Sequence, residues 1–219
     1  MENLDCYDSN DIAIIREDYY DDYDDFESVS FFYESVFDEP ILISKNIYYK
    51  DLLIAEVINQ NDRMYCLKSN YMLIADIDCG HDIDKPLVTL NSFVRTYGGT
   101  FKVYKTKNGL RYLQTDLLYQ GANKSAIAVL ELLGCDPKYI NMCKRGKNFM
   151  ARLTPKSNSA DVHDYYQNAV LGRWLNIKGK AICHYIDVVG EGKISEQLRD
   201  LYMTHNKVCQ AYNHDYELV

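Results

Sequence analysis

Residues 100–115 contain the feature that most constrains the fold of this chain. Two short segments that alternate apolar and polar residues, TFKVYKT (100–106) and LRYLQT (110–115), flank Lys107, Asn108 and Gly109. An Asn-Gly pair between two strand-like segments is a strong signal for a tight turn, because both residues tolerate the positive φ angles that such turns need. The sequence therefore predicts an antiparallel β-hairpin at this position.

Helix and strand signals alternate along the rest of the chain. Apolar periodicity, with Pro and Gly at the segment ends, predicts strands at 41–44, 71–78, 149–153 and 180–189 and helices at 48–59, 85–97, 122–133, 136–144 and 194–212. Mixed or antiparallel strands with flanking helices packed against them make an α+β fold. We expect residues 40–219 to form a single domain of this class.

The charge is distributed unevenly along the chain. Residues 1–39 hold 14 of the 32 Asp and Glu residues and only one basic residue, Arg16, within a net charge of −8. Residues 40–219 carry 23 Lys and Arg against 18 Asp and Glu, hence a net charge of about +5. Like charges at this density resist compaction, so residues 1–39 are expected to form an acidic, flexible arm.

Three roles of the acidic arm stay open at the sequence level. It is either a solvated tail or a mimic of an acidic polymer, which would cover a basic groove and compete with nucleic acid. It is also a candidate contact for a protein partner.

Composition and spacing argue against several classes of protein. Seven cysteines are scattered without a CxxC or CxxH pair, and His205 and His214 lie nine residues apart, so no zinc site is expected. No apolar run approaches the roughly 18–20 residues of a membrane span. The acidic start does not resemble a signal peptide. We therefore expect a cytoplasmic or otherwise intracellular protein with no membrane partner.

The predicted strand at 71–78 ends in two carboxylates, Asp76 and Asp78. Residues two apart in a strand share a face, so both side chains project together. Close carboxylates repel each other unless a cation lies between them, and Mg²⁺ or Mn²⁺ prefers carboxylate and phosphate oxygens. The pair therefore indicates a catalytic metal site. The alternative is a strand end whose acids are solvated or paired with Lys or Arg.

The predicted hairpin carries residues suited to phosphate binding. Gly109 lets a ligand approach the backbone closely, and the adjacent Arg111 offers a planar fork for phosphate oxygens. Lys105 and Asn108 flank the turn as further candidate contacts. The alternative is an ordinary hairpin with exposed basic residues.

A second basic stretch, at 142–158, contains five candidate contacts. Lys144, Arg145 and Lys147 are candidates for nucleic-acid binding, although cations at a helix end also complement its dipole. Arg152 interrupts an apolar strand pattern and needs a partner if buried, either a bound phosphate or an Asp. Lys156 follows it as a further candidate phosphate contact.

The order of these segments resembles a known family. An apolar strand ending in Asp-x-Asp, then TKNGLR, then ARLTPK, resembles the catalytic core of archaeo-eukaryotic primases and primase-polymerases. More closely, YKTKNGLRYLQT and FMARLTPK are similar to segments of a group of uncharacterised bacterial and viral proteins. The resemblance covers residues 71–156 well and the C-terminal third thinly. It implies a primase-like core related to the RNA-recognition-motif fold.

The resemblance assigns roles residue by residue. Asp76 and Asp78 match the metal-binding pair of that family, and Arg152 and Lys156 match its later triphosphate-contacting positions. Arg111 stands where the family has a phosphate-contacting His. Phosphate binding survives this exchange, but tuning near neutral pH does not, because Arg does not titrate there.

The third acid of the family has only weak candidates in this chain. Asp136 lies at a predicted helix start rather than on a strand, and Asp187 follows Arg152 although the family order places the acid before it. A two-metal phosphoryl transfer needs carboxylates that bridge the ions. The missing assignment leaves catalysis open.

Three functions follow from these observations. The first is a metal-dependent nucleotidyl- or phosphoryl-transfer protein of primase-like type, acting on nucleoside triphosphates or nucleic acid in replication. The second is a protein of the same fold that binds nucleotide or nucleic acid without catalysis. The third is a viral or mobile-element interaction factor that works through its acidic arm. A viral origin would place it in the host cytoplasm or a virus factory.

Overall fold

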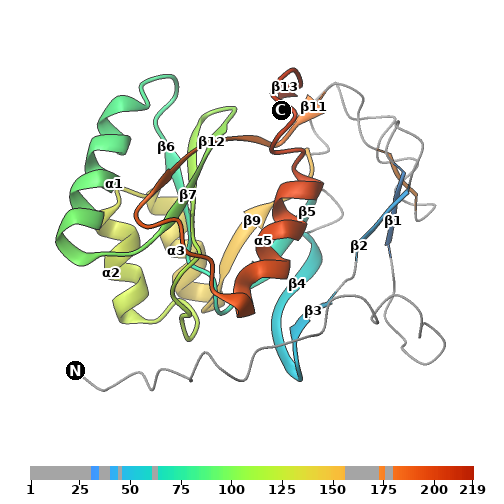
Figure 1. Ribbon diagram of the computed structural model, residues 1–219, viewed down its shortest axis with the longest axis horizontal. Helices are drawn as coiled ribbons and strands as arrows, with labels where there is room; N and C mark the ends of the chain where they lie inside the picture. Colours follow the sequence, from blue (N-terminus) through green and yellow to red (C-terminus); the bar gives the residue numbers. More distant parts are fainter. Residues whose placement is uncertain (1–30, 35–39, 44–45, 61–63, 156–172, 176–179) are drawn as a thin grey trace.

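Figure 1 shows the fold in a computed structural model, which describes residues 31–34, 40–43, 46–60, 64–155, 173–175 and 180–219. Most of the predicted acidic arm and the predicted phosphate contact Lys156 lie outside these ranges. Within them, no helix has the length and apolar character that crossing a bilayer requires.

An antiparallel sheet with strand order β12-β7-β8-β6 lies at the centre of the described structure. Its strands are β6 (Ile74–Asp78), β7 (Phe101–Thr106), β8 (Gly109–Gln114) and β12 (Cys183–Val189). Strands β7 and β8 pair up to Thr106 and Gly109, which confirms the predicted hairpin. Every residue of β8 is buried, so both faces of this sheet are covered.

A second antiparallel sheet has the strand order β3-β4-β5-β9. Its strands are β3 (Asn46–Tyr49), β4 (Leu52–Gln60), β5 (Met64–Ser69) and β9 (Phe149–Arg152). Strand β9 confirms the predicted strand at 149–153. Strand β5 was not predicted from the sequence.

The predicted helix at 48–59 is wrong, because this segment forms most of the β3–β4 hairpin. In the turn between the strands, Lys50 has a φ of 51°. The turn contains no Gly or Asn that would have indicated this conformation in the sequence. The β-branched residues Ile54 and Val57 also favour a strand over a helix. Pairing with β5 then fixes the strand, with an ion pair of 2.9 Å between Glu56 and Lys68 across the ladder.

Two small sheets contain the remaining strands of the described residues. Strands β1 (Phe31–Glu34), β2 (Pro40–Ile43) and β10 (Arg173–Leu175) form one, in the order β10-β1-β2. Strand β11 (Lys180–Ala181) pairs in parallel with β13 (Glu217–Leu218). Strand β2 confirms the predicted strand at 41–44, whereas the single strand predicted at 180–189 is divided into β11 and β12.

The described helices are α1 (Asp84–Tyr97), α2 (Lys124–Leu132), α3 (Pro137–Gly146) and α5 (Glu196–Val208). All four were predicted, although α5 is shorter than the predicted 194–212. Side-chain caps begin two of them: Asn123 accepts from the N–H of Ala126, and Asp136 accepts from the N–H of Lys138. The α+β class with antiparallel sheets is therefore confirmed.

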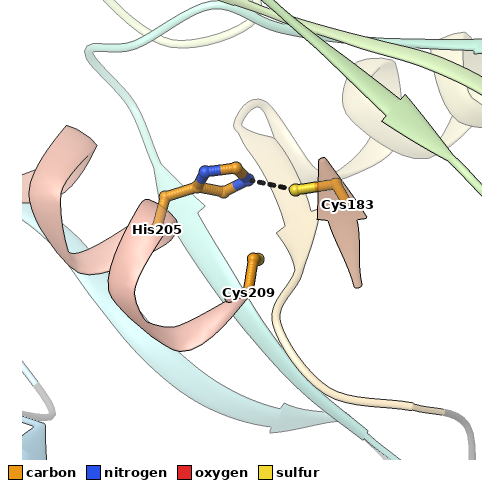
Figure 2. Close-up of side chains that lie close together, drawn as sticks. All are labelled: Cys183, His205 and Cys209. Carbon is orange, nitrogen blue, oxygen red and sulfur yellow. Dashed lines mark hydrogen bonds between the residues drawn. The ribbon is translucent and has the colours of Figure 1, made fainter. Parts of the chain in front are cut away.

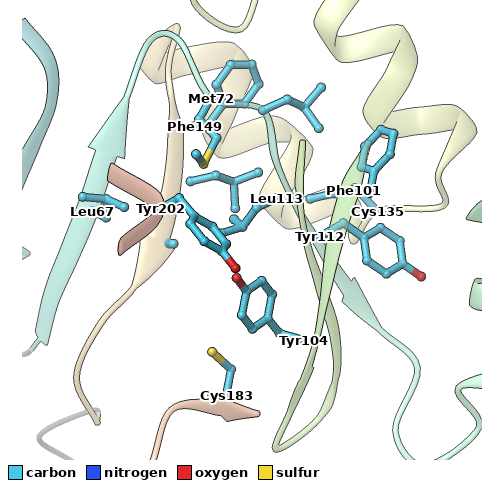
Figure 3. Close-up of a cluster of buried hydrophobic side chains, with 14 of the residues drawn as sticks. Leu67, Met72, Phe101, Tyr104, Tyr112, Leu113, Cys135, Phe149, Cys183 and Tyr202 are labelled. Carbon is cyan, nitrogen blue, oxygen red and sulfur yellow. The ribbon is translucent and has the colours of Figure 1, made fainter. Parts of the chain in front are cut away.

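Large aromatic side chains fill the core on both faces of the central sheet (Figure 3). Phe101 of β7 contacts Phe93 of α1, and Tyr104 of the same strand contacts His205 of α5. Residues three apart in a strand point to opposite faces. Helices α1 and α5 therefore cover opposite faces of the sheet, which agrees with their places in Figure 1.

The two large sheets meet where strand β6 lies beside strand β9, next to α3. The hydroxyl oxygen of Tyr139 on α3 lies 2.7 Å from the carbonyl oxygen of Ile74 in β6 and accepts from the N–H of Met150 in β9 at 3.3 Å. Tyr139 thus connects the neighbouring strands of two sheets. The candidate site lies at this junction.

Candidate functional site

Asp76 and Asp78 lie on one face of β6, at its C-terminal end. Asp76 is opposite Arg111 in the ladder with β8, and Asp78 is opposite Gly109. The side chain of Asp76 is 47% exposed, and Asp78 is exposed at the strand end. Both carboxylates are accessible from solvent.

Arg111 occupies the centre of the junction and is only 4% exposed. Its Nε lies 3.8 Å from a carboxylate oxygen of Asp76. Its Nη1 donates to the carbonyl oxygen of Arg152 at 2.9 Å and lies 3.2 Å from Nε2 of His205. Arg111 therefore connects strands β6 and β9 with helix α5.

The electrostatic surroundings keep Arg111 charged. Burial is the largest single influence on its pKa and lowers it, but the carboxylate of Asp76, together with nearby Cys and Tyr groups, outweighs burial and raises the pKa. The pKa of Arg152 is lowered, first by burial and then by Arg111, while Asp76 acts in the opposite direction. The carboxylate of Asp76 thus acts on both arginines, and Arg111 acts on Arg152.

Arg152 does not point freely into solvent. It is half-buried on β9, and its Nη2 donates to the carbonyl oxygen of Val219 at 3.0 Å. Its main-chain carbonyl oxygen accepts from Arg111, and its charge interacts with those of Arg111 and Asp76. Asp76, Arg111 and Arg152, which were predicted as metal- and phosphate-binding residues, therefore lie near one another at the junction of the two sheets.

The two candidates for a third acid lie in different places. The main-chain N–H of Asp136 donates to the main-chain carbonyl oxygen of Asp76 at 3.0 Å, so the start of α3 lies beside β6. The Asp136 side chain is used to cap that helix. Asp187 lies on β12, three strands away from β6, which corresponds to about 14 Å. Only Asp136 is near the acid pair.

The turn of the β7–β8 hairpin packs against the loop that follows β6. The carbonyl oxygen of Asn108 accepts from the two N–H groups at 79–80, at 3.2 and 2.8 Å. A Cβ atom on Gly109 would lie 2.0 Å from the carbonyl oxygen of Ile77. At Gly109 the group that comes close to the backbone is therefore strand β6, whereas the sequence had suggested a ligand. Lys105 is exposed on β7, near this turn.

The predicted nucleic-acid contacts Lys144, Arg145 and Lys147 lie at the far end of α3 from the acid pair. The helix starts beside Asp76, and its ten residues span about 15 Å. Lys144 forms an ion pair of 2.9 Å with Glu131 of α2, on the exposed surface. The structure therefore does not bring these three cations into contact with the acid pair.

Sequence reasoning missed a second group of reactive side chains, Cys183, His205 and Cys209. Cys183 begins β12, and the other two lie at the C-terminal end of α5 (Figure 2). Their potential ligand atoms all lie within 4.8 Å of one another, and all three residues are buried. Across the described ranges, no other His, Cys, Asp or Glu group of this size has metal-ligand spacing.

The missed signal in the sequence was His205-x₃-Cys209, a spacing that puts two ligands on one face of a helix. This spacing differs from the CxxC and CxxH pairs that are typical of zinc sites. Cys183 lies 22 residues before His205, and only the packing of α5 against the start of β12 brings it close. The expectation of no zinc site was based on the spacing of Cys and His in the sequence. That argument does not hold for this cluster, because the fold brings together residues that are distant in the sequence. The cluster does not indicate a site for Mg²⁺ or Mn²⁺.

Comparison with protein-family models, with curated proteins and with solved structures finds no match to this chain. A functional assignment therefore has to rest on the segments of the sequence and on the geometry of the site.

Proposed function

We propose that this protein is a metal-dependent nucleotidyl- or phosphoryl-transfer protein of primase-like type that acts on nucleoside triphosphates or nucleic acid. The observation that carries the proposal is the meeting of Asp76, Arg111 and Arg152, from strands of both large sheets. The family that the sequence segments resemble would use these positions for metal and phosphate. Their proximity supports the proposal, because the resemblance implies that the metal-binding and phosphate-binding positions share one site.

The metal would be Mg²⁺ or Mn²⁺, held by Asp76 and Asp78. Such an ion needs only one or two carboxylates when water and substrate phosphates supply its other oxygen ligands. The two acids fit this requirement because both are exposed and lie on one strand face. The bound ion would polarise the phosphoryl group of the substrate.

Arg111 would act mainly as a positioning residue. Its guanidinium is buried, its Nη1 donates to the carbonyl oxygen of Arg152, and its Nε lies 3.8 Å from the Asp76 carboxylate, which it would orient. The hairpin turn would then offer phosphate contacts, because Gly109 pairs with Asp78. Lys105 is paired with Leu110, which in turn pairs with Ile77, so its side chain lies on the opposite face of the sheet from the acids. A nucleic-acid strand that ran along α3 would reach Lys144 and Arg145 at the other end of the helix.

The second candidate is a protein that binds nucleotide or nucleic acid without catalysis. One observation favours it: across the described residues, no third His, Cys, Asp or Glu joins the Asp76–Asp78 pair at metal-ligand spacing. Two-metal phosphoryl transfer places the ions roughly 3.5–4 Å apart and uses carboxylates to bridge them. A single ion on two carboxylates is enough for binding.

Two assays on the same variants test the proposal. Calorimetric titration with a nucleoside triphosphate and Mn²⁺ measures binding, and primer extension measures transfer. Both should occur in the wild type and disappear in the double variant Asp76→Asn, Asp78→Asn. Asp187→Asn, an exposed acid on β12, is the matched control and should retain both. Binding without transfer would select the second candidate, and absence of both from the wild type would overturn the proposal.

A further inference from the structure

We propose that Cys183, His205 and Cys209 form a binding site for one thiophilic metal ion, Zn²⁺ or Cu⁺. The site is separate from the acid pair, and the proposal does not depend on the function proposed above. Sγ of Cys183 lies 4.0 Å from Nε2 of His205, and the three ligand atoms fall within 4.8 Å of one another (Figure 2). Ligand atoms bound to a common zinc ion lie at about 2.0–2.3 Å from it, which these separations allow with small adjustments.

The backbone holds the three residues in place. His205 and Cys209 are separated by one helical turn, and the N–H of Cys209 donates to the carbonyl oxygen of His205 at 2.9 Å. The carbonyl oxygen of Cys209 accepts from the N–H of Ile182, the residue before Cys183, at 3.0 Å. The third ligand is therefore fixed to the first two by main-chain hydrogen bonds rather than by loose side-chain packing.

The hydrogen bonds of His205 indicate which of its nitrogens would bind a metal. Its Nδ1 lies 3.3 Å from Oδ1 of Asn206, an atom that also accepts from the hydroxyl of Tyr104 at 2.6 Å. An amide oxygen accepts only, so Nδ1 carries the proton and donates. The lone pair is then on Nε2, which lies 3.2 Å from Nη1 of Arg111 and 4.0 Å from Sγ of Cys183. Metal-binding His residues are oriented in this way by a partner on their other nitrogen.

The neighbouring Arg111 is compatible with a bound ion. Its Nη1 now donates to Nε2 of His205, and an ion would take over that lone pair. Arg111 would keep its bond to the Arg152 carbonyl and its pairing with Asp76. Two thiolates would balance the charge of Zn²⁺. The C-terminal end of α5, where two ligands lie, also favours a cation.

The ligand set selects the kind of metal. Thiolate sulfur and imidazole nitrogen prefer Zn²⁺ and Cu⁺, whereas Mg²⁺ and Mn²⁺ prefer oxygen. All three ligands are buried, with no exposed surface on either sulfur. An ion at this buried position would join α5 to the start of β12. Three protein ligands suit a three-coordinate Cu⁺ ion, whereas a tetrahedral Zn²⁺ ion would need a fourth ligand beside these three. Binding would release the thiol protons of Cys183 and Cys209.

The test uses the full chain, purified under reducing conditions without chelator. Elemental analysis should find one zinc or copper ion per chain. After the ion is removed, Co²⁺ titration should give a thiolate-to-cobalt charge-transfer band that Zn²⁺ abolishes, and a chromophoric competitor should report Cu⁺ binding. Cys183→Ala and Cys209→Ala should lose the band and the stoichiometric ion. Cys143→Ala removes an equally buried thiol on α3 and should retain both.

The wild-type measurements test the metal site even if a variant of one of its ligands does not fold. A reduced, folded wild type that carries neither ion, shows no charge-transfer band and binds no Cu⁺ would overturn the proposal. An equal loss in Cys143→Ala would do the same, because it would trace binding to general stability. A disulfide between Cys183 and Cys209 in the reduced preparation would also contradict it.

Discussion

Arg111 shows how one residue can serve both the fold and the site. It is buried on the central strand of one sheet, yet its donors reach Asp76, the carbonyl of Arg152 and His205. The sequence predicted its position beside the acids but not these partners. Its place beside the acids was expected from the family resemblance and arises from the pairing of β6 with β8, whereas contact with β9 and α5 depends on how two sheets and a helix pack.

Replacing Arg111 by Met should lower the free energy of unfolding by about 1–3 kcal/mol, because two buried acceptors lose their donor. The cost stays below the roughly 3–5 kcal/mol of breaking a fully buried ion pair, since Asp76 is 47% exposed and can be solvated. Urea denaturation measures it. Arg145→Met, on the surface of α3, should change stability by less than about 0.5 kcal/mol. Unchanged stability in Arg111→Met would mean that Arg111 is free to serve a ligand instead.

Local signals predicted most elements where turn chemistry or capping was strong. Asn108-Gly109 predicted the β7–β8 hairpin, and Asp136-Pro137 predicted the start of α3. The β3–β4 hairpin was missed because its turn uses Lys50 at positive φ, which the sequence does not announce. The Cys183, His205 and Cys209 cluster was missed for a different reason, since its members come together only through the packing of α5.

At the scale of elements, Tyr139 is expected to hold the two sheets together at β6 and β9. Tyr139→Phe removes a buried hydroxyl that contacts Ile74 and Met150. The free energy of unfolding should fall by about 1–3 kcal/mol, because buried backbone groups lose a partner. Chemical denaturation of the variant measures this. Tyr97→Phe, in which the exposed Tyr97 loses its hydroxyl, is the matched control and should behave as the wild type. Equal stability of the two variants would contradict the bridging role.

At the scale of the whole molecule, the acidic arm is the largest unassigned feature. Most of it lies outside the described residues, and its role stays a hypothesis. Strand β1, at 31–34, pairs with β2 and β10 and should be retained in any truncation. Removing only residues 1–30 takes away 11 acidic residues and Arg16, which changes the net charge from −8 to about +2.

If the arm covers a basic surface, the chain without residues 1–30 should bind single-stranded nucleic acid more tightly than the full chain. The gain should be largest at low salt, because added salt screens charge and weakens phosphate contacts. Fluorescence anisotropy at several salt concentrations measures it. Adding the excised peptide back should reduce the binding again. Equal binding at every salt concentration would make the arm a solvated tail or a contact for a protein partner.

The central claim is that Asp76 and Asp78 hold a divalent ion, and a thermal melt with Mn²⁺ tests it most directly. An ion that binds only the folded state at a hundredfold excess over its Kd adds about 2.7 kcal/mol of stability. For a chain of this size the melting temperature should rise by about 5–10 °C. The rise should be absent from the double variant Asp76→Asn, Asp78→Asn and intact in Asp187→Asn. An equal rise in the double variant would place the ion elsewhere and contradict the account.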